Sequence, residues 1–188
     1  MKVYFSSSLR AKKLYQKTFK FIYQVIKDLG YVHTSDFLLQ AKPEDYYQRR
    51  GKNFAQFYRN LINQIKKADV CVFEVSLHSL GIGYCVDLAL QMNKPVVILY
   101  KKGANPIFFQ GIKSEKLQLY EYKHHDDLKD VLKGALEIAK GLIDIRFTFF
   151  ISPKINRFLS WVVKNKKVPR AVYLRGLLKE AMKKERFK

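Results

Sequence analysis

Two periodicities of apolar residues alternate along residues 1–143. Short apolar runs, most of them rich in β-branched and aromatic residues, predict strands at residues 2–5, 31–34, 70–74, 95–99 and 117–120. Between most of these runs, apolar residues recur every three to four positions and predict helices at residues 11–29, 53–67, 84–92 and 125–142. This alternation favours an α/β fold, a doubly wound sheet of five parallel strands of the flavodoxin-like kind, with a polar loop at residues 41–52.

The pattern changes after residue 143 and predicts a separate small unit, residues 144–188. Residues 146–152 alternate between apolar and mostly polar side chains, which predicts a short strand. Ser152 and Pro153 predict the start of a helix, and Pro169 predicts the start of a second helix; each helix carries an apolar stripe. Because one strand and two short helices form a thin core, we expect this unit to pair with a second copy of itself.

This strand–helix–helix pattern resembles the ribbon-helix-helix repressors. In that family two chains pair their strands into an antiparallel ribbon that enters the major groove of DNA. The resemblance implies that outward-facing strand residues read bases and that the start of the second helix contacts phosphate. The DNA-binding residues implied in this way are Arg146, Thr148, Phe150 and Arg170. A basic helical hairpin that packs on its own domain, or an amphipathic segment on an anionic membrane surface, remains an alternative.

Composition narrows the class of protein. The chain has 188 residues with 48% hydrophobic content, enough for one medium domain and a small appended unit. No apolar run is long enough to span a membrane, and we expect a cytoplasmic protein. Cys71 and Cys85 form neither a disulfide framework nor a zinc-ligand set, so we expect no metal and no cofactor.

The net charge of +20 is unevenly distributed along the chain. Residues 144–188 carry 13 Lys and Arg against 3 Asp and Glu, which is half of the net charge in about a quarter of the length. Excess positive charge at this density favours a polyanionic partner. Duplex DNA is the polyanion that the tail pattern indicates.

Two loops of the first 143 residues carry side chains suited to a phosphate. In a sheet of strand order 2-1-3-4-5, the loops after strands one and three border the ligand crevice. Hydroxyls, a guanidinium, and glycines at the start of a helix are groups that bind phosphate. The candidates are Ser6, Ser8 and Arg10 in the first loop and Ser79, Gly81 and Gly83 in the second. We therefore expect a nucleotide or another phosphate ligand at this crevice.

Four segments, residues 3–10, 68–75, 79–84 and 93–100, resemble the nucleoside 2-deoxyribosyltransferases. They look closest to the 2′-deoxynucleoside 5′-monophosphate N-glycosidases of that family, and the similarity spans nearly all of residues 1–143. The resemblance implies that a 5′-phosphate is held by Ser6, Ser8, Arg10, Ser79 and Gly81. It also implies that Tyr4 lies near the sugar.

The same resemblance marks two catalytic carboxylates that this chain lacks. The family has a glutamate directly after the segment that matches residues 79–84, and Cys85 stands there. Its second carboxylate corresponds to residues 59–61, which contain no acid. Cleavage of a glycosidic bond passes through an oxocarbenium-like state that needs such groups. Two alternatives remain open for Cys85: a thiolate activated at a helix N-terminus, or an inert buried thiol. Two also remain open for Glu74, which either reaches the crevice or caps the following loop.

Three functional hypotheses follow. The first is a dimeric DNA-binding regulator, a dimer or a dimer of dimers, whose deoxyribosyltransferase-like domain binds a nucleotide without turning it over. The second is an enzyme, a divergent nucleoside or deoxynucleotide N-glycosidase or 2-deoxyribosyltransferase that uses Glu74 or Cys85. The third is a module that lies on a membrane surface. It is kept as an alternative only, because we expect no membrane among the partners of this protein.

Overall fold

The computed structural model describes residues 1–42, 54–144 and 147–186. The chain forms two compact units, Met1–Asp144 and Ile145–Lys188. Most of the polar loop predicted at residues 41–52 lies outside the described residues, and so does Arg146. No helix among the described residues is long and apolar enough to cross a membrane.

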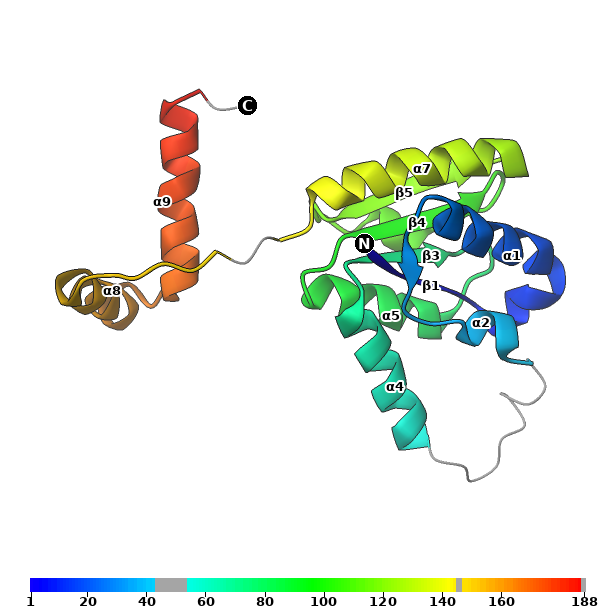
Figure 1. Cartoon of the computed structure of the whole chain (residues 1–188), viewed down its shortest axis with the longest axis horizontal. Helices are drawn as coiled ribbons and strands as arrows, with labels where there is room; N and C mark the ends of the chain where they lie inside the picture. Colours follow the sequence, from blue (N-terminus) through cyan, green and yellow to red (C-terminus); the bar gives the residue numbers. More distant parts are fainter. Residues whose placement is uncertain (43–53, 145–146, 187–188) are drawn as a thin grey trace. The chain divides into compact units, whose positions relative to one another are not determined.

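The first unit is built on a five-stranded sheet of order β2-β1-β3-β4-β5 (Figure 1). Its strands are β1 Lys2–Ser7, β2 Val32–His33, β3 Val70–Glu74, β4 Val96–Lys101 and β5 Leu117–Tyr122. Every neighbouring pair is parallel. The predicted α/β class, the five parallel strands and the flavodoxin-like order are therefore confirmed.

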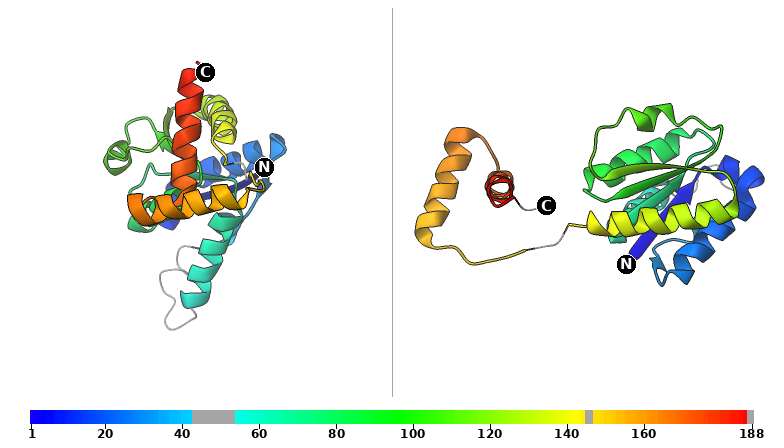
Figure 2. Two further views of the ribbon diagram at one scale, coloured as in Figure 1. Left: turned by 90° about the vertical axis from the view of Figure 1, so that its left-hand side faces the viewer. Right: turned by 90° about the horizontal axis from the view of Figure 1, so that it is seen from above.

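Helices cover both faces of this sheet, because alternate residues of each central strand point to opposite sides. The helical elements are η1 Leu9–Ala11, α1 Lys12–Asp28, α2 Phe37–Gln40, α4 Phe54–Lys67, α5 Leu80–Gln91, α6 Ile107–Gln110 and α7 His125–Gly141. Val3 and Phe5 pack in a core that α1 and α7 complete. Tyr4, Cys71 and Phe73 pack in a second core with α4 and α5. The two helix layers are visible on either side of the strands in Figures 1 and 2.

Helix α5 begins four residues earlier than the sequence pattern predicts. It starts at Leu80, with Ser79 as its N-cap residue, so Gly81 and Gly83 lie inside the helix and not in a loop. Glycine has low helix propensity and carries no apolar side chain, which hid the first turn from the periodicity. The consequence is that the helix N-terminus lies directly after β3, at the crevice.

The second unit contains the two helices that the pattern predicts, and its described residues, 147–186, include no strand. Helix α8 spans Pro153–Lys166 and helix α9 spans Arg170–Lys184, and the Ile155 amide donates to the Ser152 hydroxyl as an N-cap bond of 3.4 Å. The strand predicted at 146–152 is not confirmed: residues 147–152 have no regular structure in this single chain, and Phe147, Thr148, Phe149 and Phe150 are all exposed. A strand needs a hydrogen-bonded partner, and one copy of the tail supplies none.

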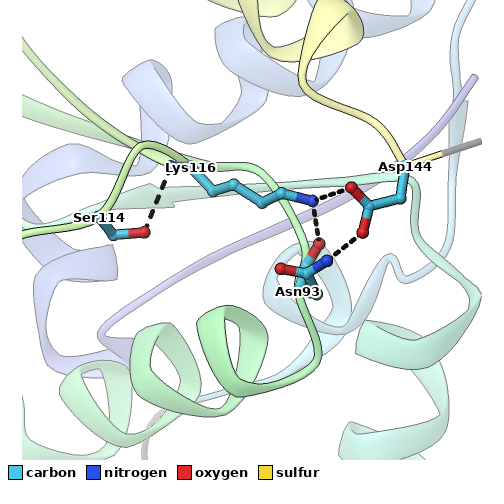
Figure 3. A network of polar contacts seen from close by, with 4 residues as sticks. All are labelled: Asn93, Ser114, Lys116 and Asp144. Atoms are coloured by element: carbon cyan, nitrogen blue, oxygen red, sulfur yellow. Dashed lines mark hydrogen bonds and ion pairs between the residues drawn. The ribbon is translucent and has the colours of Figure 1, made fainter. Parts of the chain in front are cut away.

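A polar network holds the end of the first unit (Figure 3). The ammonium of Lys116 lies 2.7 Å from one carboxylate oxygen of Asp144 and donates to the Asn93 carbonyl at 2.9 Å. The Asn93 side-chain amide donates to the other carboxylate oxygen. Asp144, the last residue of the first unit, is therefore tied to the turn before β4 and to the segment leading into β5.

Candidate functional site

A cavity of about 390 Å³ opens at the carboxyl ends of β1 and β3. Its walls come from the end of β1, from η1, and from α2, α4 and the first turns of α5. The cavity brings together most of the site residues that the sequence predicted: Tyr4, Ser6, Ser8, Arg10, Ser79, Gly81 and Cys85. Gly83 and Glu74 do not line it.

The three consecutive serines after β1 have different roles. Ser7 is buried, and its hydroxyl donates to the Glu74 carbonyl at 2.7 Å and to the Glu74 carboxylate at 3.2 Å. Ser8 is only 3% exposed, lines the cavity, and its hydroxyl has no hydrogen-bond partner. A buried hydroxyl without a partner costs stability, so such a hydroxyl on a residue that lines a cavity favours a polar ligand nearby.

Helix α5 presents its N-terminus to the same cavity. The first-turn amides of Leu80, Gly81 and Ile82 have no partner within the helix, whereas the Gly83 amide already donates to the Ser79 carbonyl at 3.0 Å. The Ser79 hydroxyl makes no capping bond. Ser8, Ser79 and Arg10 thus line the same cavity as the first turn of α5, where the helix dipole favours an anion.

Glu74 is fully buried beside the cavity and acts within the fold. Its carboxylate accepts hydrogen bonds from the hydroxyls of Ser7, Ser76 and Tyr122, the last at 3.0 Å. Burial raises the pKa of this carboxyl above its ordinary value, and these hydrogen bonds offset only part of that rise. Because Glu74 does not line the cavity, the geometry favours the loop-capping role over contact with a ligand.

Cys85 lines the cavity at the position where the resemblance expects a glutamate. The residue is 5% exposed, and burial raises the pKa of its thiol to about 11, so it is protonated at neutral pH. Tyr4 lies nearby, also buried, and burial raises the pKa of its hydroxyl as well. Among the described residues that line the cavity there is no Asp or Glu.

Aromatic side chains form the part of the lining that sequence reasoning missed. They are Phe37 on α2, Phe57 and Tyr58 on α4, and Tyr84 on α5. The apolar spacing of α4 identified a helix with a buried side, but not that two of its turns extend past the core and reach a ligand site. Only the tertiary fold brings α2 and α4 to this crevice.

Comparisons with known proteins give relatives of the first unit. No family model matches the chain. The first unit is similar to nucleotide N-hydrolases. Two proteins named "Putative 2′-deoxynucleoside 5′-phosphate N-hydrolase 1" are 29% identical over 137 residues, in Syntrophotalea carbinolica, and 27% identical over 149 residues, in Thermofilum pendens. These matches span 72% and 73% of this chain and 94% and 99% of the relatives.

A mammalian relative and a solved structure extend the comparison. The 5-hydroxymethyl-dUMP N-hydrolase of Rattus norvegicus is 27% identical over 127 residues, 64% of this chain and 76% of that protein. The structure of the Clostridium botulinum CMP N-glycosidase BcmB matches 71% of this chain and 98% of its own, with a TM-score of 0.50 and 16% identity, which shows a shared fold. These comparisons favour the enzyme hypothesis for the first unit over the DNA-binding regulator.

The structure places the expected DNA-binding residues of the tail in different settings. Thr148 and Phe150 are exposed, as base-reading residues must be. The guanidinium of Arg170 donates to Asn156 at 3.0 Å and to the Ser160 hydroxyl at 2.7 Å, so it joins α9 to α8. Among the described residues, no group of three or more His, Cys, Asp or Glu side chains is placed to hold a metal ion.

Proposed function

We propose that residues 1–144 bind a 2′-deoxynucleoside 5′-monophosphate in the cavity at the ends of β1 and β3. The observation that carries this proposal is the buried Ser8 hydroxyl, which has no hydrogen-bond partner and belongs to a residue that lines the cavity together with Arg10 and the N-terminus of α5. A phosphate oxygen supplies the missing hydrogen-bond partner, and its charge suits the guanidinium and the helix dipole. The names of the relatives supply the nucleotide class.

Isothermal titration with four 2′-deoxynucleoside 5′-monophosphates and their parent nucleosides tests this proposal. The phosphate contacts described above are made only by the monophosphates, so we expect each monophosphate to bind at least about tenfold more tightly than its nucleoside. Equal affinity for both would remove the phosphate assignment. Binding of neither would remove the site.

The relatives also favour a reaction, hydrolysis of the N-glycosidic bond. That reaction needs a carboxylate on the sugar face, and the described lining offers the neutral thiol of Cys85 in its place. We therefore expect the wild-type protein to release free base very slowly. Both carboxylates that the resemblance implies are missing from the described lining, whereas residues suited to binding a phosphate are present.

Replacing the thiol by a carboxylate tests this account of the chemistry. We expect Cys85→Glu to raise the rate of base release from deoxynucleotides by roughly a hundredfold or more, the usual contribution of one positioned acid or base. Cys85→Gln is the matched control, since it has the same size and no charge. Chromatography of released base measures both. A rate that stays equal in the two variants, with nucleotide binding intact, contradicts the placement of Cys85 at the sugar.

A second proposed function concerns the tail: two copies of residues 145–188 pair and bind duplex DNA. The observation that favours it is how little this unit buries, because Leu159 and Val162 are its buried hydrophobic residues among those described. Paired strands at residues 146–152 would complete the ribbon that one chain lacks. The positive charge of the tail then faces a polyanion.

Binding to a pool of DNA duplexes across a salt series tests the tail. We expect the full chain to select sequences and to lose affinity steeply with salt, and residues 1–144 alone to do neither. Weak, unselective binding by both the full chain and residues 1–144 would leave only a general attraction between the basic protein and DNA.

A further inference from the structure

The cavity has an aromatic wall, made of Phe37, Phe57, Tyr58 and Tyr84, in addition to its phosphate-binding end. The rings of Phe37 and Phe57 lie 5.3 Å apart between centroids. Those of Tyr58 and Tyr84 lie 6.3 Å apart at 33°. The four rings, on three different helices, therefore form two pairs, and both pairs line the cavity.

Helix α4 explains why two of these rings reach the cavity. Its apolar side buries Ile65 fully in the core and Leu61 partly, while Phe57 and Tyr58, one to two turns earlier, are progressively more exposed. Aromatic residues on the apolar side of an amphipathic helix normally pack in the core. Here the core ends near Leu61, and the rings beyond it line an open space.

The polar atoms of the aromatic wall are already engaged with each other. The hydroxyls of Tyr58 and Tyr84 are 2.5 Å apart and share a hydrogen bond. That bond raises the pKa of Tyr84 and keeps its hydroxyl neutral. No described residue of this wall carries an amide, carboxylate or guanidinium that could read the edge of a base.

We propose that this aromatic wall holds the nucleobase by its flat face, and that the site accepts purine and pyrimidine 5′-monophosphates alike. The inference rests on the nucleotide-binding function proposed above and adds its base specificity. Every base has a π face, so stacking tolerates any base, whereas discrimination needs hydrogen bonds to base edges. The cavity volume of about 390 Å³ lies within the range of small-molecule sites.

Titration calorimetry on the full chain tests the aromatic wall with five ligands: dAMP, dGMP, dCMP, dTMP and 2-deoxyribose 5-phosphate. Because stacking is sequence-tolerant, we expect the four nucleotides to bind within about fivefold of one another. The sugar phosphate lacks the base and should bind roughly tenfold more weakly or worse.

Variants separate the base contact from the phosphate contact. Phe57→Leu keeps an apolar side chain but removes the π face, so it should weaken all four nucleotides by about fivefold or more and leave the sugar phosphate unchanged. Phe54→Leu, an exposed position on the same helix outside the cavity, should change neither and is the matched control. Tyr58→Leu serves as the second test variant if Phe57→Leu lowers the folded fraction seen by circular dichroism.

The outcomes distinguish the two proposals. A preference of more than about fiftyfold for one base overturns stacking as the mode of recognition, because stacking alone does not discriminate so strongly. Unchanged nucleotide affinity in both Phe57→Leu and Tyr58→Leu also overturns it, while phosphate binding stands. Failure of all five ligands to bind overturns both the base contact and the nucleotide-binding function.

Discussion

At the scale of single residues, the proposed nucleotide site depends on the Ser8 hydroxyl. Buried polar groups are almost always paired, and an unpaired hydroxyl costs roughly 1–3 kcal/mol. The fold keeps this one unpaired at the cavity, 3% exposed, while the adjacent Ser7 is fully used by Glu74. A residue that destabilises the empty protein and completes a ligand's contacts is typical of a binding site.

Ser8→Ala should therefore separate stability from affinity. We expect an unfolding free energy equal to that of the wild type or up to about 1 kcal/mol higher, because an unsatisfied hydroxyl is removed. Affinity for a nucleoside monophosphate should fall by roughly tenfold. Thermal unfolding and calorimetry measure the two quantities.

The neighbouring serine provides the contrast. Ser7→Ala removes a hydroxyl that donates to Glu74, so it should destabilise the protein by about 1–3 kcal/mol. A loss of stability in Ser8→Ala as large as in Ser7→Ala would show that the Ser8 hydroxyl has a partner within the protein.

Glu74 should make stability depend on pH. Its raised pKa means that the folded protein holds the proton more tightly than the unfolded chain does. The protonated carboxyl therefore contributes its full share of the unfolding free energy below the ordinary carboxyl pKa of about 4.3. That contribution is lost as the pH rises through the raised pKa of the folded protein.

Glu74→Gln keeps a neutral group at every pH. From about pH 4 upward, we expect the wild type to lose unfolding free energy relative to this variant until the carboxyl is fully ionised. Urea unfolding followed by circular dichroism at several pH values measures the difference. A difference that stays constant with pH would mean that the carboxyl titrates normally in the folded protein.

At the scale of single elements, the sequence predicted those with a strong apolar period and missed the others. The five strands and the long helices α1 and α7 follow from their periodicity. The short helices α2 and α6 have too few residues for a period, and the glycines of α5 hid its first turn. The residues of the phosphate loops could be recognised from their chemistry, whereas the aromatic lining depends on how α2 and α4 pack.

The end of α8 permits a prediction about one backbone position. Lys167, its C-cap residue, has a left-handed backbone with φ of 55°, which favours glycine. Lys167→Gly should stabilise the tail by about 1 kcal/mol. Lys164→Gly, within the helix, should destabilise it by about 1 kcal/mol. Fluorescence of Trp161 on α8, the single tryptophan, reports the unfolding of the tail. The same sign of change in both variants would contradict the left-handed cap.

At the scale of the whole molecule, the two units differ in how much they bury. The first unit has two extensive cores, one on each face of its sheet, whereas the second leaves Phe149, Phe158, Trp161 and Leu178 exposed among other large apolar residues. Small units that bury so little are marginal alone. We therefore expect the tail to depend on a partner for its stability, and the first unit to be stable without one.

This difference predicts two unfolding transitions that respond differently to protein concentration. If tails pair, the midpoint reported by Trp161 fluorescence should rise with concentration by mass action. The midpoint of the first unit, followed by circular dichroism, should stay constant. A Trp161 midpoint that is independent of concentration would contradict pairing through the tail.

The network of Asn93, Lys116 and Asp144 makes the end of the first unit a suitable position for fusing another domain. Asp144 is fastened to the turn before β4 and to the segment leading into β5, so the last described residue of this unit is held by contacts within the unit itself (Figure 3). A foreign domain could replace everything after residue 144 without loosening the cavity at the opposite, carboxyl ends of β1 and β3. Residues 1–144 could then be joined to a different C-terminal domain and still bind the proposed nucleotide.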